Sequence, residues 1–163
     1  MIKILEDLDI TPLLECYKNL ENDIQWSEFQ TGKQVGLQHR KDGNPWSDAV
    51  GQVKAGVNNG WDQELLINPL FKDTPFEYYI KKYKLRRTRL MWIKPLACYS
   101  MHRDYTPRLH IPLITNPNCY FVFKEKGLFN MPAGHAYWVD TTKEHSAMNC
   151  SNQWRLHLIG MNV

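Results

Sequence analysis

The chain has 163 residues, of which 43% are hydrophobic and 12% aromatic, and its formal net charge is +3. This length suits one compact domain with a single core and is too short for two ordinary domains. No apolar stretch is long enough to cross a bilayer, and Met1-Ile2-Lys3-Ile4-Leu5 leads directly into acidic residues, so we expect neither a membrane span nor a signal sequence. The sequence therefore predicts an intracellular, cytoplasmic protein.

Cysteine spacing and charge distribution narrow the possible partners. The four cysteines form no C-x-x-C pair, which argues against a zinc knuckle and favours their role as small buried hydrophobic residues. Basic residues are scattered except in the stretch from Lys81 to Arg87, which a solvated helix face explains as well as a nucleic-acid contact does.

Two segments in the first half of the chain predict helices. Thr11-Pro12 supplies an N-cap and a proline at the first helical position, and apolar residues follow at helical spacing for roughly 12 residues. Thr74-Pro75-Phe76-Glu77 has the pattern of a capping box, and an apolar stripe then repeats at i, i+3, i+4 and i+7. Between them, Gln30 to Asn68 is rich in Gly, Asn and Asp, which predicts short elements and loops.

The second half of the chain has the texture of β-strands separated by turn signals. That spacing favours an antiparallel sandwich or barrel, with the two helices covering one outer face of the sheet. We therefore expect one mainly β domain with flanking helices (α+β) over residues 1–163, with a helical and loop part to about residue 88 and a β core from about residue 89. The predicted strands cover Leu90–Ile93, Leu109–Ile114, Cys119–Phe123, Ala136–Val139 and Trp154–Ile159.

A histidine and an aspartate one residue apart form the first candidate metal-binding pair. In His102-Arg103-Asp104, alternate residues of an extended chain project to the same side, so both side chains can reach one ion. Two histidines and one carboxylate on one face of an octahedron leave positions for a bidentate cosubstrate and O₂, as in non-haem Fe(II) oxygenases. The motif alone is too short to identify such a site.

A distant histidine and an arginine supply further candidates. His145 lies at the start of a predicted strand, and Arg155 follows inside the last strand. The planar guanidinium of an arginine favours two-pronged binding of a carboxylate. Surface histidines, a turn aspartate and an ordinary salt-bridge partner for Arg155 remain the alternative interpretations of these residues.

Five short segments of the second half carry a family resemblance in their order and spacing. They are His102-Arg103-Asp104, Arg108-Leu109-His110-Ile111-Pro112-Leu113, Gly134-His135-Ala136-Tyr137-Trp138-Val139-Asp140, His145, and Trp154-Arg155-Leu156-His157-Leu158-Ile159-Gly160. Together they resemble the aspartyl/asparaginyl β-hydroxylase family of 2-oxoglutarate oxygenases. The resemblance covers a little over a third of the chain, and residues 1 to 89 carry no matching motif.

The resemblance implies a double-stranded β-helix, a cupin-like jelly roll, and an oxygenase that depends on Fe(II), 2-oxoglutarate and O₂. It implies that Arg155 pairs with the distal carboxylate of 2-oxoglutarate, that Arg108 and His110 help to hold this cosubstrate, and that the iron ligands are His102, Asp104 and His145. The animal enzymes that name the family lack the carboxylate ligand, so the presence of Asp104 makes this chain look more like bacterial and phage relatives.

The expected reaction is hydroxylation of an unactivated C–H bond in a free amino acid or a peptidyl residue, with release of succinate and CO₂. Substrate would enter through the loops between residues 30 and 70, where Trp46 and Trp61 are candidates for a lid. Two alternatives stay open. One is a cupin-like binding module without turnover, and the other is modification of nucleic acid by the same chemistry, motivated by the basic run from Lys81 to Arg89.

Overall fold

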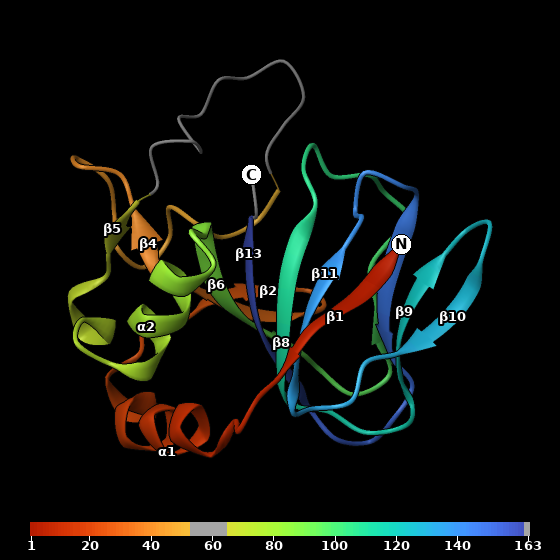
Figure 1. The fold of residues 1–163 in the computed structure, drawn as a ribbon, viewed down its shortest axis with the longest axis horizontal. Coiled ribbons are helices and arrows are strands. Elements are labelled where there is room, and N and C mark those ends of the chain that lie inside the picture. Colours follow the sequence, from red (N-terminus) through yellow and green to blue (C-terminus); the bar gives the residue numbers. More distant parts are fainter. Residues whose placement is uncertain (53–64, 162–163) are drawn as a thin grey trace.

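The computed structural model describes residues 1–52 and 65–161 of the chain. Two antiparallel sheets lie face to face, and helices α1 (Thr11–Leu20) and α2 (Pro75–Lys82) lie on one side of them (Figure 1). The 3-10 helix η1 (Glu21–Asp23) follows α1, and η3 (Pro69–Phe71) precedes α2. Within the described ranges, no helix combines the length and apolar character that spanning a membrane requires.

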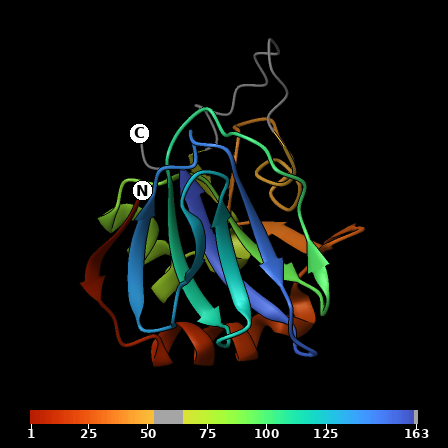
Figure 2. The same cartoon turned by 90° about the vertical axis from the view of Figure 1, so that its right-hand side faces the viewer.

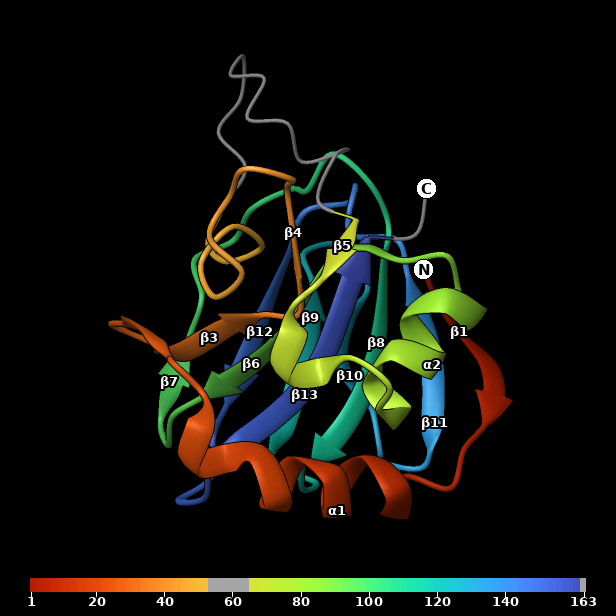
Figure 3. The same cartoon turned by 90° about the vertical axis from the view of Figure 1, so that its left-hand side faces the viewer.

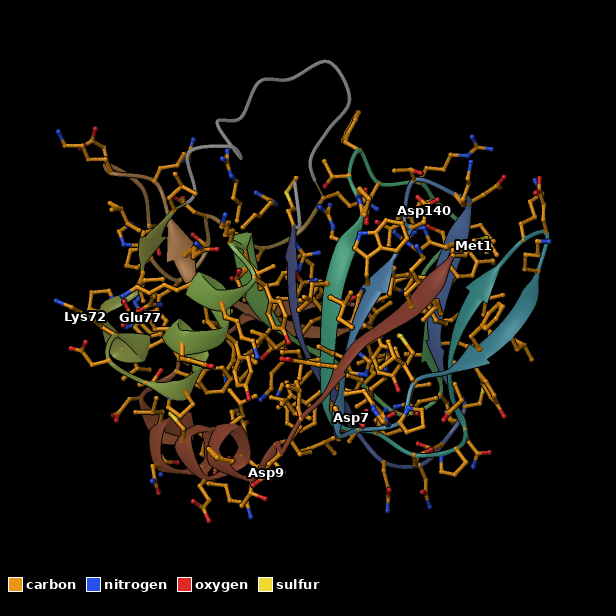
Figure 4. All side chains as sticks on the ribbon, in the orientation of Figure 1. Met1, Asp7, Asp9, Lys72, Glu77 and Asp140 are labelled. Carbon is orange, nitrogen blue, oxygen red and sulfur yellow. The ribbon has the colours of Figure 1, made fainter. Side chains whose placement is uncertain are left out.

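The larger sheet joins segments from both ends of the chain. In the described residues it has seven strands, and the N-terminal strand closes one edge, where the Asp140 N–H donates to the Met1 carbonyl oxygen at 2.7 Å (Figure 4). Their spatial order is β1 (Ile2–Asp7), β11 (His135–Val139), β8 (Arg108–Ile114), β13 (Arg155–Met161), β6 (Arg86–Ile93), β3 (Gly32–Gly36) and β2 (Ser27–Phe29).

The smaller sheet covers one face of the larger sheet, and Figure 2 views the molecule from its side. Its four strands in the described residues are β10 (Gly127–Asn130), β9 (Cys119–Phe123), β12 (His145–Asn149) and β7 (Ala97–Cys98). A separate two-stranded ribbon pairs β4 (Gln38–His39) with β5 (Leu66–Ile67).

The opposite face of the larger sheet packs against the two helices (Figure 3). Leu13 and Tyr17 of α1 and Phe76 and Ile80 of α2 are buried in this contact. They meet alternate residues of the central strands, because side chains of a strand point to opposite faces in turn. The central strands contribute Leu90, Leu109, Ile111, Leu156 and Leu158.

A second apolar cluster lies mainly between the two sheets. It comprises Ile93, Phe121, Phe123, Met131, Tyr137, Val139 and Ala147. Strand β13 shows how the two faces divide: Leu156 and Leu158 face the helices, whereas Arg155 and His157 are buried on the other face. Buried polar side chains are rare without a partner or a function, so this inner face is where a site is expected.

Both predicted helices are confirmed, but their capping differs from the prediction. Thr11 is inside α1, whose N-cap is Ile10, and the Thr11 N–H donates to Asp9 Oδ1 at 2.9 Å. At α2, Thr74 is the N-cap but its hydroxyl donates to the Phe71 carbonyl oxygen instead of accepting from the helix. The capping-box hydrogen bonds are therefore absent at this end of α2.

The five predicted strands are confirmed as β6, β8, β9, β11 and β13, and the antiparallel arrangement is confirmed as well. The N-terminal part is not only helices and loops, since β1, β2 and β3 join the larger sheet. β1 is largely exposed, β2 has three residues, and β3 is mostly buried but carries Val35 as its one apolar side chain, so none shows the sustained apolar alternation that marks a strand in a sequence.

Candidate metal centre

A cavity of about 390 Å³ opens between the two sheets. All six residues singled out from the sequence line it, although they come from four separate segments of the chain. They are His102, Asp104, Arg108, His110, His145 and Arg155.

Three of these residues bring one potential metal-binding atom each to the same point. The ring nitrogens of His102 and His145 and a carboxylate oxygen of Asp104 all lie within 4.8 Å of one another. His145 begins β12, and an isolated antiparallel bridge pairs it with His102. The side chains of His102 and Asp104 thus lie close enough together to bind one ion, which is the arrangement expected of the H-x-D step.

Backbone contacts fix which ring nitrogen of each histidine faces the cluster. His102 Nδ1 lies 2.8 Å from the Ser100 carbonyl oxygen, and His145 Nδ1 lies 2.8 Å from the Lys143 carbonyl oxygen. A carbonyl oxygen only accepts, so each Nδ1 donates and each Nε2 keeps its lone pair. Burial also lowers the pKa of His145, which favours the neutral imidazole that a metal requires.

Asp104 is held by its backbone and by an ion pair. Its N–H donates to the Thr141 carbonyl oxygen at 2.8 Å. Its Oδ2 lies 3.2 Å from Arg108 Nε, a distance typical of an ion pair but without the alignment of a hydrogen bond. Burial acts to raise the pKa of Asp104, but the positive charges of Arg108 and Arg89 outweigh it and hold the pKa below its ordinary value. The carboxylate is therefore ionised at neutral pH and able to bind a cation.

Arg155 is a buried cation without a carboxylate. Its side chain is 3% exposed, and no Asp or Glu among the described residues forms an ion pair with it. Its closest polar contact is His157 Nε2, 2.9 Å from Arg155 Nε. Burial lowers the pKa of Arg155 to about 10, so the guanidinium remains charged at neutral pH. Such a group is costly unless a ligand supplies the missing negative charge.

Arg108 and His110 lie on neighbouring inward positions of β8. Arg108 Nη1 donates to Thr106 Oγ1 at 2.8 Å, which fixes the guanidinium beside Asp104. Burial lowers the pKa of His110 well below its ordinary value, and the nearby charge of Arg155 adds to the effect. His110 is thus a neutral imidazole at neutral pH, able to donate one hydrogen bond and accept another.

The cavity also contains residues that the sequence interpretation did not select. Arg89 of β6 lines it, as does Thr141, which carries the carbonyl that holds Asp104. Gln34, Gly51 and Gln52, from the described part of the 30–70 stretch, form part of its wall. Arg89 precedes a predicted strand by one residue, so extending the alternation of that strand would have placed it on the same face as Met91.

The two tryptophans proposed for a lid have different outcomes. Trp46 packs against the apolar cluster beneath the helices and does not line the cavity. Trp61 lies outside the described residues.

A family model described as aspartyl/asparaginyl beta-hydroxylase matches residues 70–161, more than half of the chain. The chain belongs to the aspartyl/asparaginyl β-hydroxylase family. The matched region contains all six residues of the candidate site.

The chain is also similar to one curated relative and, in fold, to one solved structure. The chain is 32% identical over 105 residues to L-proline cis-4-hydroxylase from Rhizobium meliloti (strain 1021). The match covers 58% of this chain and 37% of the relative, so the chain spans well under half of that protein's length. An oxidoreductase of the 2OG-Fe(II) oxygenase family from Burkholderia pseudomallei superposes with a TM-score of 0.56 at 14% identity, covering 91% of this chain and 76% of that one. The jelly-roll fold implied by the resemblance is therefore confirmed.

Proposed function

We propose that the chain is an Fe(II)- and 2-oxoglutarate-dependent oxygenase that hydroxylates an unactivated C–H bond of a free amino acid or a peptidyl residue. The observation that carries the proposal is one cavity holding both a His-Asp-His cluster and a buried arginine with no carboxylate partner among the described residues. Membership of the aspartyl/asparaginyl β-hydroxylase family supports it. L-Proline is the first substrate to test, because the curated relative is named for it.

The donor set fits iron(II). Two imidazole nitrogens and one carboxylate oxygen form the facial triad that non-haem Fe(II) oxygenases use. The Nδ1 contacts of His102 and His145 to backbone carbonyls are the outer hydrogen bonds expected of metal-binding histidines. In this proposal His102, Asp104 and His145 hold the metal.

The positive charge of Arg155 fits the negative charge of the distal carboxylate of 2-oxoglutarate. A carboxylate there would neutralise the buried guanidinium, and the strand β13 would fix its direction. Arg108 and the neutral His110, on the adjacent strand β8, would help to hold the cosubstrate between Arg155 and the metal. When bound, the iron and its cosubstrate supply O₂ activation coupled to decarboxylation, which yields succinate and CO₂.

The apolar part of the wall would keep bulk water from the reacting atoms. Met91, Phe121 and Ile159 line the cavity beside the polar residues. Phe121 stacks on the His145 ring with centroids 5.0 Å apart, so it also limits rotation of that imidazole. These residues act by positioning and exclusion, and the cofactor carries the chemistry.

The basic run does not favour nucleic acid as the substrate. Lys81 pairs with Glu77 and Lys82 with Glu6 on the surface of α2. Arg87 is buried, and Arg89 lines the cavity. The run is therefore divided between the helix surface and the interior, and does not form one exposed basic face.

An anaerobic titration of the purified protein with Fe(II) and 2-oxoglutarate tests the proposal. The parent should develop the weak visible charge-transfer band of the iron–cosubstrate complex. His102→Ala should lose the band, and Arg155→Gln should need at least about tenfold more 2-oxoglutarate, since a charge-assisted hydrogen bond contributes about 1.5–3 kcal/mol. His39→Ala and Arg86→Gln, at positions outside the cavity, are the matched controls.

The outcomes separate the candidate functions. Absence of the band in the parent under all conditions would overturn the iron and 2-oxoglutarate assignment. A band without succinate formation in air, with L-proline and other amino acids or peptides present, would instead indicate a binding module that does not turn over.

A further inference from the structure

The cavity carries more positive charge than metal and cosubstrate account for. Among its described lining residues are three arginines, Arg89, Arg108 and Arg155, and one carboxylate, Asp104. A divalent metal and the doubly charged 2-oxoglutarate cancel each other. The loaded site would thus keep an excess of about two positive charges, counted as three cations against one anion.

Arg89, like Arg155, is a buried cation of the cavity without an ion pair to a carboxylate of the described residues. Its Nη1 donates to the Ala49 carbonyl oxygen at 3.1 Å, and its buried Nε has no hydrogen-bond partner. No carboxylate of the described residues forms an ion pair with it, whereas Arg108 is paired with Asp104. Burial lowers the pKa of Arg89 to about 10, and repulsion from Arg108 and Arg87 adds to this, so the group is still charged at neutral pH.

Arg89 and Arg155 enter the cavity from distant positions along the paired strands. In the pairing of β6 with β13, Arg155 is opposite Ile93 and Arg89 is opposite Ile159. The two arginines are therefore offset by four residues along the strands, about 13 Å at 3.3 Å per residue. The two carboxyl carbons of 2-oxoglutarate are separated by four C–C bonds, which extend about 5 Å. The backbone positions of the two arginines are thus further apart along the strands than the length of one cosubstrate molecule.

The surroundings of Arg89 belong to the wall formed by residues 30–52. Gln34 Oε1 accepts from the Gly51 N–H at 3.0 Å, and Gln34 Nε2 lies 3.5 Å from the Tyr99 hydroxyl. Both glutamine and tyrosine line the cavity. Arg89 therefore shares the cavity with neutral polar groups that can complete the recognition of a small polar ligand.

We propose that Arg89 binds the carboxylate of the substrate, and that the substrate is a free amino acid and not a residue within a peptide. This inference rests on the proposed function and narrows its substrate class. The cavity volume supports the choice: about 390 Å³ is near the lower end of the roughly 300–1,000 Å³ typical of ligand sites, and 2-oxoglutarate occupies part of it.

Binding without turnover tests the inference. The protein is loaded with Zn(II), which does not activate O₂, and with 2-oxoglutarate, whose affinity is measured first. Individual L-amino acids, starting with L-proline, and the corresponding L-amino-acid amides are then titrated by calorimetry. N-Acetyl-L-aspartate methylamide is included because its side-chain carboxylate imitates a peptidyl aspartate.

At least one amino acid should bind the parent about tenfold or more tightly than its amide, because the amide lacks the charge. Arg89→Gln should remove this preference while 2-oxoglutarate affinity stays within about twofold. Arg89→Lys, which keeps the charge, should retain part of the preference. Lys94→Gln removes one positive charge from an exposed residue just beyond β6 and should behave as the parent.

The contrary outcomes are distinct. Equal binding of acids and amides, binding of the aspartate mimic in place of free amino acids, or an unchanged Arg89→Gln would overturn the inference and leave the proposed function standing. A loss of 2-oxoglutarate affinity in Arg89→Gln equal to that in Arg155→Gln would assign Arg89 to the cosubstrate instead. If Arg89→Gln does not fold, Arg89→Lys provides the test. Complete loss of the preference for the acid in Arg89→Lys, which keeps the charge, would then count against the inference. Failure of the parent to bind Zn(II) and 2-oxoglutarate would overturn both proposals.

Discussion

His102 and His145 are joined by an isolated β-bridge in which the N–H of each donates to the carbonyl oxygen of the other at 2.9 Å. The two imidazoles, whose ring centroids are 4.4 Å apart, are thus positioned by backbone hydrogen bonds. Asp104 is tied to the same region, because its N–H donates to the Thr141 carbonyl oxygen. The geometry of the candidate metal centre therefore depends on how firmly the 139–145 connection is held.

Thr141→Val should weaken metal binding without removing any metal-binding atom. The Thr141 hydroxyl donates to the Thr106 carbonyl oxygen at 2.8 Å, so it links the segment that holds Asp104 to the turn before Arg108. Valine keeps the shape but leaves a carbonyl unpaired, at a cost of about 1–3 kcal/mol in the free energy of unfolding. We expect about tenfold weaker Zn(II) binding in a chelator competition assay. Thr142→Val, the adjacent threonine, is the control, and equal loss in both would contradict a specific role for Thr141.

Arg155→Met should stabilise the metal-free protein while removing 2-oxoglutarate binding. The buried guanidinium has no carboxylate partner among the described residues. Replacing even a buried ion pair with apolar side chains is often neutral or stabilising by about 1–4 kcal/mol, and an unpaired charge lacks the attraction that offsets its desolvation. Urea denaturation of the metal-free parent and variant measures this change in the free energy of unfolding. Addition of Zn(II) and 2-oxoglutarate should stabilise the parent by mass action but leave the variant unchanged.

Arg108→Met provides the contrast for that experiment. Arg108 is also buried but pairs with Asp104, which is itself partly exposed. Its removal should therefore lower the free energy of unfolding, by about 1–3 kcal/mol after allowance for solvent around Asp104. A result in which both methionine variants lose stability equally would show that Arg155 is not an uncompensated charge.

Asp48→Asn should destabilise the protein at neutral pH but not in acid. Its carboxylate accepts from the Arg40 and Asn44 backbone N–H groups at 3.0 and 3.1 Å and pairs with the Arg40 guanidinium. Burial acts to raise the pKa of Asp48, but these hydrogen bonds outweigh it and the pKa is lowered. A group with a lowered folded pKa stabilises fully above its unfolded pKa, about 3.9, and the effect is lost as pH falls through the folded value.

The parent and Asp48→Asn should thus differ by about 1–2 kcal/mol at pH 7, and the difference should shrink below about pH 3.9. Urea denaturation from pH 7 to pH 3 measures it. Asp42→Asn, in the same loop, is the control because its carboxylate shows none of these contacts. A difference between parent and Asp48→Asn that does not depend on pH would refute the role of the charge.

The sequence carries enough information to predict both helices, five of the strands and, through the family resemblance, the grouping of the six site residues. Apolar periodicity predicts the helices and these strands, whereas the grouping of the site residues depends on the order and spacing of the motifs that carry the family resemblance. Strands β1 and β2 were not predicted, because they are edge strands that form by pairing with β11 and β3. Only tertiary pairing shows that β1 closes the larger sheet.

Arg89 shows a different limit of sequence reasoning. In the sequence it belongs to a run of lysines and arginines, a composition typical of a solvated surface. In the fold, α2 ends at Lys82 and β6 begins at Arg86, so the run changes from helix to strand and its last arginine points into the cavity. The boundary between two elements, which sequence patterns locate poorly, therefore decides whether this charge is on the surface or in the cavity.

Gly32→Ala should destabilise the protein strongly, because the approach of β3 to β6 leaves no room for a side chain. A Cβ on Gly32 would lie 2.0 Å from the Trp92 carbonyl oxygen, a backbone atom held in the sheet, and Gly32 has a φ of +156°. Relief requires β3 to move away from β6, which would also displace Gln34 from the cavity wall. We expect a loss of about 3 kcal/mol or more in the free energy of unfolding. Gly127→Ala is the control: its φ is also positive, at +84°, but nothing lies within 4 Å of the added Cβ, so the loss should stay at about 1–2 kcal/mol. Urea denaturation of both variants decides the matter, and losses of equal size would mean that the β3–β6 contact yields easily and that Gln34 is not held rigidly at the cavity.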